Sequence, residues 1–325
     1  MDYSVRTEGF EELEAEWTAL LQSSINPMVF LTPAWLKQWW EIFGDGLELC
    51  ITALRRGDRL VAVAPLFKEG HKLAFLGDPS VCDYHDFVVH EDDSENIYQA
   101  LFRALDDTEW QLLDLTAVQP ASPSYRLVPD WARARGYSVE VVPFDVCPGL
   151  SLPISWEDYV SSLGKKDRHE LRRKMRRLSE AGELKYYTVG DNHEFEQGME
   201  DFLRLLKDSR PDKAEFLTPQ VEEFFRRMGQ TLARTECAKL AFLELDGKKV
   251  ASILYYDYNG SYSLYNSGFD PAFSHVSVGL ISKALCLKEA IESGKKRFDF
   301  MRGAEPYKYD LGGQDQPVYR ITIRR

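Results

Sequence analysis

The last third of the chain places the strongest constraint on its fold. Alternating apolar residues, separated by Asp-Gly and Asn-Gly turns, predict antiparallel strands at residues 238–245, 248–258 and 260–268. An apolar-striped helix follows, and after it comes one more short strand at residues 297–301. A strand at residues 183–189 and two helices precede this group. The order strand, two helices, three strands, helix and strand predicts an α/β domain.

The segment at which the helix after these three strands begins is a candidate anion site. It comprises Ser274, His275, Val276, Ser277, Val278 and Gly279, and Leu280 follows. The first N–H groups of a helix have no acceptor inside it, and small residues such as Ser277 and Gly279 let a diphosphate approach closely. The alternative is a plain turn from strand to helix. We therefore start from the hypothesis of a phosphorylated carrier.

Length and charge limit the class of protein. The 325 residues suffice for two domains of about 150 residues each, and 44% hydrophobic with 13% aromatic residues predict a folded globular protein. A net charge of −12 would repel nucleic acid at long range, yet residues 165–177 hold eight Lys or Arg and two acidic residues. A polyanion would therefore have to bind at this one place.

Several classes are not favoured. The N-terminus has no basic patch before an apolar run, and no window approaches the roughly 18 apolar residues of a membrane helix. Five cysteines without C-x-x-C spacing suit a reducing cytoplasm, where we expect the protein. The histidines at 71, 85 and 90 lack zinc spacing, so no metal is expected. The absence of a nucleophile elbow and of a P-loop disfavours hydrolases and kinases.

A proline- and glycine-containing joint at residues 147–153 predicts two domains, residues 1–150 and residues 151–325. The first domain begins with helices at residues 10–22 and 34–43, which precede a hairpin and further strands and helices. It therefore repeats the order of the second domain loosely.

This order and a set of motifs resemble the Gcn5-related N-acetyltransferase (GNAT) fold in tandem. Residues 165–310 look like the acetyltransferase domain named for the CelD and BcsL proteins of cellulose biosynthesis, itself similar to the Fem peptidyltransferases. The motifs are the basic run 168–177, Asp246-Gly247, Gly268-Phe269-Asp270-Pro271, Gly279, Gly294, Phe298-Asp299-Phe300, Gly303 and Tyr307-Lys308. Upstream, Phe30 to Trp35, Ala64 to Leu66, and Gly77 with Asp83-Tyr84 resemble the N-terminal halves found beside that domain.

The resemblance implies an α/β protein of two tandem GNAT-like domains, each a mixed, mainly antiparallel sheet flanked by helices. It implies acetyl-coenzyme A or another acyl-coenzyme A as donor and direct transfer to an amine or hydroxyl, without a covalent enzyme intermediate. A nucleotide sugar, polysaccharide or cell-envelope precursor is the implied acceptor. In this family the carrier pyrophosphate lies on the helix-start loop, which here is residues 275–280.

Four residues near the last predicted strand are candidates for the chemistry. Asp299 alternates with two phenylalanines on the strand, so it faces away from them and is either held by hydrogen bonds or acts as a general base. Glu305 is a second candidate base. Tyr307 could donate a proton to the leaving thiolate or stabilise an oxyanion, and Lys308 could bind a carrier or substrate anion. The alternative for this loop is to tie down the C-terminal tail.

The basic helix offers candidate substrate ligands. Arg168 and Arg172 border its apolar stripe and could present forked donors to a phosphate or carboxylate of the acceptor. Arg173 and Arg177 point the opposite way and are expected in solvent. The alternative is a surface helix whose cations are all solvated.

In the first domain, Asp83, Tyr84 and His85 form a comparable polar cluster. His85 is a candidate base, and turn capping is the alternative.

Two other functions stay open. One is aminoacyl transfer from tRNA in the manner of the Fem ligases, which the basic helix favours and the acidic remainder disfavours. The other is a non-catalytic scaffold that has lost coenzyme binding. Small-molecule donor and acceptor are the expected partners, and the sequence does not indicate an oligomeric state.

Overall fold

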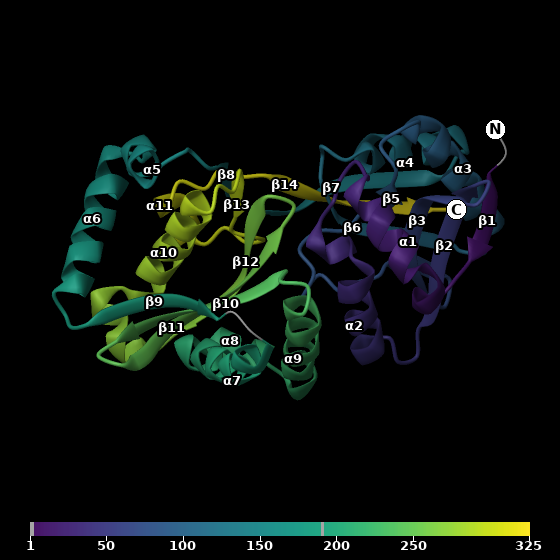
Figure 1. The fold of residues 1–325 in the computed structure, drawn as a ribbon. Coiled ribbons are helices and arrows are strands. Elements are labelled where there is room, and N and C mark those ends of the chain that lie inside the picture. Colours follow the sequence, from purple (N-terminus) through teal and green to yellow (C-terminus); the bar gives the residue numbers. More distant parts are fainter. Residues whose placement is uncertain (1–2, 190–191) are drawn as a thin grey trace. The chain divides into compact units, whose positions relative to one another are not determined.

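The computed structural model describes residues 3–189 and 192–325, which divide into two compact units (Figure 1). The first unit comprises Met1–Val146 and Gln316–Arg325, and the second comprises Cys147–Asp315. The chain thus leaves the first unit shortly before residue 150. Its last ten residues lie in the first unit, whereas the predicted boundary at residue 150 places them in the second domain.

The first unit is built on a mixed sheet in the order β1-β2-β3-β4-β6-β14-β7, with β5 paired to β3. The strands are β1 (Ser4–Thr7), β2 (Glu48–Arg56), β3 (Arg59–Glu69), β4 (Lys72–Phe75), β5 (Val88–Val89), β6 (Leu112–Val118), β7 (Ser138–Val146) and β14 (Pro317–Arg324). The helices are α1 (Phe10–Gln22), the 3₁₀ helix η1 (Val29–Leu31), α2 (Pro33–Phe43), α3 (Ser94–Asp107) and α4 (Pro123–Ala134). Only the β4–β6 pair is parallel among the pairs described.

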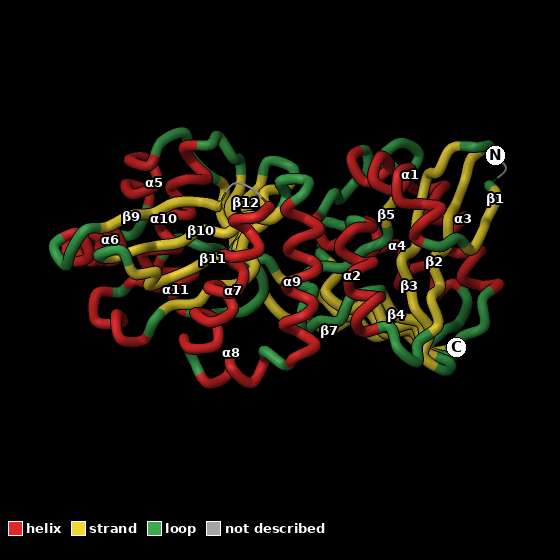
Figure 2. The backbone as a smooth tube through the Cα atoms, turned by 60° about the horizontal axis from the view of Figure 1, so that its bottom comes forward, coloured by secondary structure: helices red, strands yellow, loops and turns green. Residues whose placement is uncertain are grey.

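The second unit has a sheet in the order β8-β13-β12-β11-β10-β9, and Figure 2 shows β9, β10 and β11 running side by side. Its strands are β8 (Gly149–Ser151), β9 (Leu184–Val189), β10 (Ala238–Leu245), β11 (Lys248–Tyr258), β12 (Ser261–Phe269) and β13 (Arg297–Asp299). Its helices are α5 (Trp156–Ser162), α6 (Lys165–Ser179), α7 (Asn192–Ser209), α8 (Pro211–Phe216), α9 (Pro219–Ala233), η2 (Pro271–Val276), α10 (Val278–Glu292) and α11 (Pro306–Asp310). The predicted α/β class, with two mixed, mainly antiparallel sheets flanked by helices, is confirmed.

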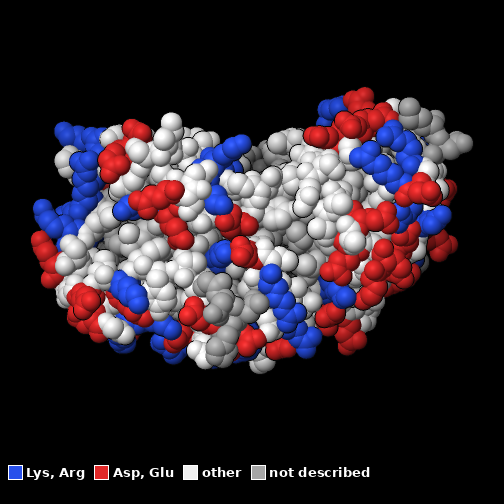
Figure 3. Space-filling view, viewed as in Figure 1, with Lys and Arg blue, Asp and Glu red and all other residues white. Residues whose placement is uncertain are grey.

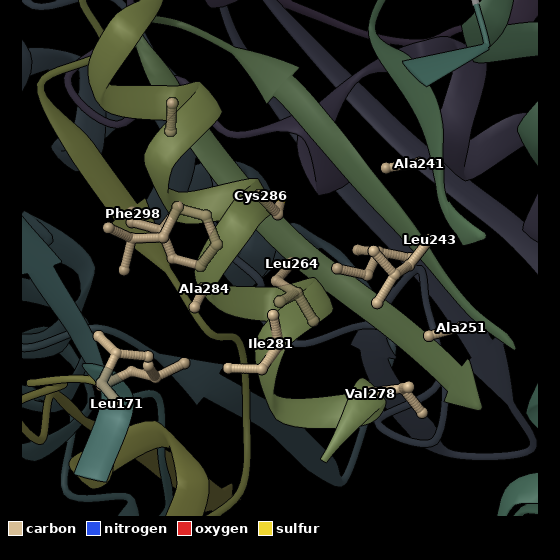
Figure 4. Close-up of a cluster of buried hydrophobic side chains, with 14 of the residues drawn as sticks. Leu171, Ala241, Leu243, Ala251, Leu264, Val278, Ile281, Ala284, Cys286 and Phe298 are labelled. Carbon is tan, nitrogen blue, oxygen red and sulfur yellow. The ribbon is translucent and has the colours of Figure 1, made fainter. Parts of the chain in front are cut away.

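Helices cover both faces of the second sheet. Successive residues at the end of β12 show this, because a Cβ on Gly268 would meet the backbone of Leu206 in α7, whereas Phe269 packs against Gly279 in α10. The α10 face holds the apolar core, in which side chains of α6, α10 and the sheet meet (Figure 4). Burying each aliphatic side chain there contributes roughly 1.5–3 kcal/mol, so α10 is held firmly on the sheet.

None of the helices in the described residues is both long and apolar enough to span a bilayer. The five cysteines are unpaired.

Candidate active site

Strands β12 and β13 separate soon after they meet. They pair in parallel only from Ser261 to Ser263, whereas β12 continues to Phe269. A register shift against β11 inserts Tyr265 as an extra residue in β12, and such a bulge bends the strand that carries it. Residues 264–269 of β12 therefore have an edge that β13 does not cover.

The helix after β12 begins abruptly. A 3₁₀ turn, η2, leads to Ser277, whose φ of 62° is left-handed and whose side chain does not cap α10. The N–H groups of Leu280 and Ile281 donate to Ser277 O over 3.1 and 3.0 Å. Within the described residues the N–H groups of Val278 and Gly279 have no backbone acceptor, so two donors remain at this end of α10.

Arg177 of α6 lies at the same place. Its Nη2 donates to Ser277 Oγ over 3.0 Å, and its Nε is buried without a hydrogen-bond partner in the described residues. The expectation that Arg177 is solvated is wrong, because the last turn of α6 packs close to η2 and α10. A cation and two free N–H groups therefore meet at the start of α10.

The other residues of the predicted anion loop differ in their surroundings. Val276 and Val278 are buried in the core, Leu280 packs against it, and His275 is exposed, with Nδ1 3.1 Å from Ala272 O. Gly279 is required for packing, because a Cβ there would lie 2.8 Å from the Phe269 ring.

Further along α10, the side chain of Lys283 is buried. Its Nζ donates to Gly279 O over 2.7 Å and lies 4.7 Å from the centre of the Tyr307 ring. Burial, together with the positive charges of Lys213 and Lys308, lowers the pKa of Lys283 to about 7. Lys283 is not among the site residues predicted from the sequence, although a lysine inside an apolar helical stretch is a visible signal.

The loop after β13 brings Glu305, Tyr307 and Lys308 together. Lys308 Nζ donates to the carbonyl oxygens of residues 301, 302 and 303 and lies 2.9 Å from Glu305 Oε2. The Tyr307 hydroxyl has no hydrogen-bond partner in the described part of the chain, and burial raises its pKa. Burial alone would raise the pKa of Glu305, but the Lys308 ammonium lowers it below the ordinary value, so Glu305 is ionised. Lys308 is therefore occupied in fastening the loop, while Tyr307 keeps a proton to donate.

Asp299 is buried at the end of β13. It accepts hydrogen bonds from Met301 N over 2.8 Å and from Arg297 Nη2 over 3.2 Å. Asp299 pairs with Ser263 of β12, six residues before Phe269, the end of β12 that packs against the start of α10. Asp299 therefore belongs to the paired part of the sheet. These contacts fit a carboxylate that shapes the turn after β13.

The predicted acceptor ligands on α6 lie partly in solvent. Arg168 donates to Ser161 O over 3.0 Å, and Arg172 is exposed. Figure 3 shows Lys and Arg side chains gathered over α6.

The polar cluster of the first unit is buried. Asp83 and Tyr84 have little exposure, and the His85 ring lies between Gly77 O and Thr116 O at 3.1 and 3.2 Å. The neighbouring Asp86 accepts hydrogen bonds from Ser124 Oγ and from the N–H of Phe87.

Across residues 3–189 and 192–325, no group of three or more His, Cys, Asp or Glu side chains is arranged to hold a metal ion.

Residues 165–309 match the family model of the acetyltransferase (GNAT) domain, nearly the stretch on which the sequence resemblance rested. Solved structures with the same fold cover almost the whole chain. FemX is 12% identical, with a TM-score of 0.67 over 98% of this chain and 96% of its own. The C-terminal domain of a putative lysylphosphatidylglycerol synthetase from Agrobacterium fabrum is 10% identical, with a TM-score of 0.59 over 98% and 92%. A tandem GNAT protein from the clavulanic acid biosynthesis pathway is 13% identical, with a TM-score of 0.50 over 98% of each chain. No curated protein sequence matches the chain.

The match of residues 165–309 to the acetyltransferase domain makes the protein an enzyme of the acyltransferase class. More particularly, the chain carries a GNAT acetyltransferase domain at residues 165–309 within a tandem GNAT-like architecture. The predicted GNAT resemblance is confirmed, and the narrower resemblance to the CelD and BcsL domain stays a prediction.

Proposed function

We propose that the enzyme transfers an acyl group directly from a thioester carrier, acyl-coenzyme A in the first place, to an amine or hydroxyl acceptor. The observation that supports this most is the meeting of free helix N–H groups and Arg177 at the start of α10. A diphosphate placed there would accept from the N–H groups of Val278 and Gly279 and from Arg177 Nε. The helix dipole also favours a negative charge at this end.

The uncovered edge of β12 supports the position of the carrier arm. Residues 264–269 continue beyond the last β13 pair toward the start of α10. An extended pantetheine arm can form strand-like hydrogen bonds with such an edge. This would bring the thioester from the α10 end toward Tyr307, and backbone N–H groups of β12 would face the carbonyl oxygen.

The chemistry we propose needs no covalent intermediate. The acceptor nitrogen or oxygen attacks the thioester carbonyl carbon, a bond forms there, and the carbon–sulfur bond breaks. Glu305, which is ionised, receives the proton of the acceptor, and the Tyr307 hydroxyl supplies a proton to the leaving thiolate. Asp299 serves the structure of the loop. The choice of a nucleotide sugar, polysaccharide or cell-envelope precursor as acceptor, and of the cytoplasm as location, still rests on the resemblance and on the unpaired cysteines.

Aminoacyl transfer from tRNA is the second candidate. The likeness to FemX and the exposed cations of α6 (Figure 3) favour it.

Ligand-dependent thermal stability tests the proposal. Coenzyme A at 100 times its Kd is expected to stabilise the protein by about 2.7 kcal/mol. Pantetheine, which lacks the diphosphate, is expected to bind at least ~10-fold more weakly because it loses charge-assisted hydrogen bonds. Stabilisation by deacylated tRNA and not by coenzyme A would replace the first candidate with the second. Stabilisation by neither would favour a scaffold.

A further inference from the structure

Lys283 has fewer partners than a charged lysine requires. Its residue is 7% exposed, and in the described part of the chain its Nζ makes one hydrogen bond, to Gly279 O. An ammonium group has three N–H donors. The Tyr307 ring face at 4.7 Å offers a favourable surface for a cation but no lone pair. Two donors of a charged Lys283 are therefore unsatisfied inside the protein.

The neighbouring charges leave Lys283 without a counter-charge of its own. Glu305 is the carboxylate whose charge acts on Lys283, and Lys308 already lies 2.9 Å from it. Lys213 of α8 adds a second positive charge that acts on Lys283. A charged Lys283 would therefore share this one carboxylate with Lys308, which is costly at a buried position unless another anion is present.

Lys213 lies beside the part of β12 that β13 does not cover. Lys213 donates to Asn266 Oδ1 over 2.8 Å, and Asn266 directly follows the bulge in β12. Helices α7 and α10 cover opposite faces of the sheet, and Lys213 follows α7 while Lys283 lies on α10. Lys213 is therefore held at the uncovered part of β12, Lys283 lies at the Tyr307 ring, and the two lysines are close enough for the charge of one to act on the other.

We propose that Lys283 and Lys213 form a subsite for an anionic group of the acyl acceptor, a carboxylate or a phosphate monoester near the nucleophile. The subsite rests on the proposed acyl transfer and specifies its acceptor class. An oxygen anion here supplies the missing acceptors for Lys283 and a counter-charge for its ammonium group. It is separate from the proposed diphosphate position, whose donors are Arg177 and the first N–H groups of α10.

Matched acceptors test the subsite by turnover. Phosphoethanolamine is compared with ethanolamine, and β-alanine with propylamine, by following thiol release from acetyl-coenzyme A. At least one anionic acceptor should have a kcat/KM about tenfold above its neutral partner, the scale of one charge-assisted hydrogen bond. The two pairs distinguish phosphate from carboxylate. Equal rates within both pairs would overturn the proposal.

A variant separates the subsite from the carrier site. Lys283→Met should abolish the advantage of the anionic acceptor through a higher KM for that acceptor, while the affinity for coenzyme A stays unchanged. Lys288→Met, which removes a partly exposed lysine paired with Glu292, is the matched control and should retain the advantage. Loss of coenzyme A affinity in Lys283→Met would assign Lys283 to the carrier and overturn the proposal.

A measurement without turnover keeps the two proposals distinguishable. The Nζ resonance of Lys283 is followed by NMR in ¹⁵N-lysine-labelled protein and is assigned by its loss in Lys283→Met. It should titrate near pH 7, because burial and the charges of Lys213 and Lys308 lower the pKa, while Glu305 and Cys286 act in the opposite direction. Phosphoethanolamine or β-alanine should raise the midpoint, and ethanolamine should not. A raised midpoint in a protein without thiol release would retain the anion subsite and reject acyl transfer. Thiol release with an unchanged titration midpoint would retain acyl transfer and reject the anion subsite.

Discussion

The guanidinium of Arg177 donates to the hydroxyl of Ser277 over 3.0 Å and so joins the last turn of α6 to the start of α10. A cation near a helix N-terminus is unfavourable by itself, because that end of the helix dipole is positive. Its buried Nε also lacks a hydrogen-bond partner in the described residues. Both features are relieved when an anion lies between Arg177 and α10.

Arg177→Met should therefore raise the Kd for coenzyme A at least ~10-fold, the equivalent of one or two charge-assisted hydrogen bonds. Isothermal titration calorimetry measures the change. The melting temperature should move little, because the single hydrogen bond to Ser277 is worth about 0.5–1.5 kcal/mol.

Arg176→Met is the control for charge alone. Arg176 is exposed on the same turn and pairs loosely with Glu180 at 3.8 Å. Its removal should leave the affinity for coenzyme A near the wild-type value. An equal loss in both variants would show that only the general positive charge of α6 matters.

Asp299→Asn should lower stability and preserve the chemistry. The carboxylate accepts from Met301 N and from Arg297, so its neutralisation weakens both bonds in a buried place at a cost of about 1–3 kcal/mol. Chemical denaturation measures this loss, and kcat per folded molecule should remain within a few fold. Asp310→Asn, an exposed substitution, is the control. A loss of kcat with unchanged stability would return Asp299 to the role of general base.

Most elements of the second unit could be predicted because their signals are local. Turn residues and alternating side chains identified β10 and β11 at the observed residues. The placement of β14 between β6 and β7 could not be predicted in this way. The alternating apolar residues around Ile321 and Ile323 indicate a strand, but they do not indicate which sheet the strand joins. Strand β14 pairs with residues more than 170 positions earlier in the chain.

Only part of the candidate site could be predicted from the sequence, for two physical reasons. The helix start at residue 277 was visible, since unsatisfied N–H groups follow from any helix. The role of Arg177 could not be predicted. A helical wheel assigns one buried face to α6, but it does not show that the last turn of α6 contacts Ser277. The environment of Lys283 could not be predicted either, because the charges that act on it belong to Lys213 and Lys308, which are distant in sequence.

Gly279 should tolerate no larger residue because of Phe269. A Cβ at residue 279 would lie 2.8 Å from the ring, so Gly279→Ala should cost about 1–3 kcal/mol and weaken coenzyme A binding by moving the start of α10. In a double-mutant cycle, Phe269→Ala should remove part of that cost. The free energy of unfolding of the double variant should thus exceed the additive value. Strict additivity would show that the glycine is needed for another reason.

Lys283 makes stability depend on pH in a direction that its burial determines. Because the folded protein lowers the pKa of Lys283 from 10.5 to about 7, it binds fewer protons than the unfolded chain between these values. The free energy of unfolding therefore rises with pH across that window. Below pH 7 the full cost of burying a charged Lys283 is present. Without ligand, Lys283→Met should melt at least ~2 °C above the wild type at pH 6.5, and the difference should shrink toward pH 10. Lys288→Met should show no such trend. A Met variant that is less stable than the wild type at pH 6.5 would mean that Lys283 is charged and satisfied without any anion.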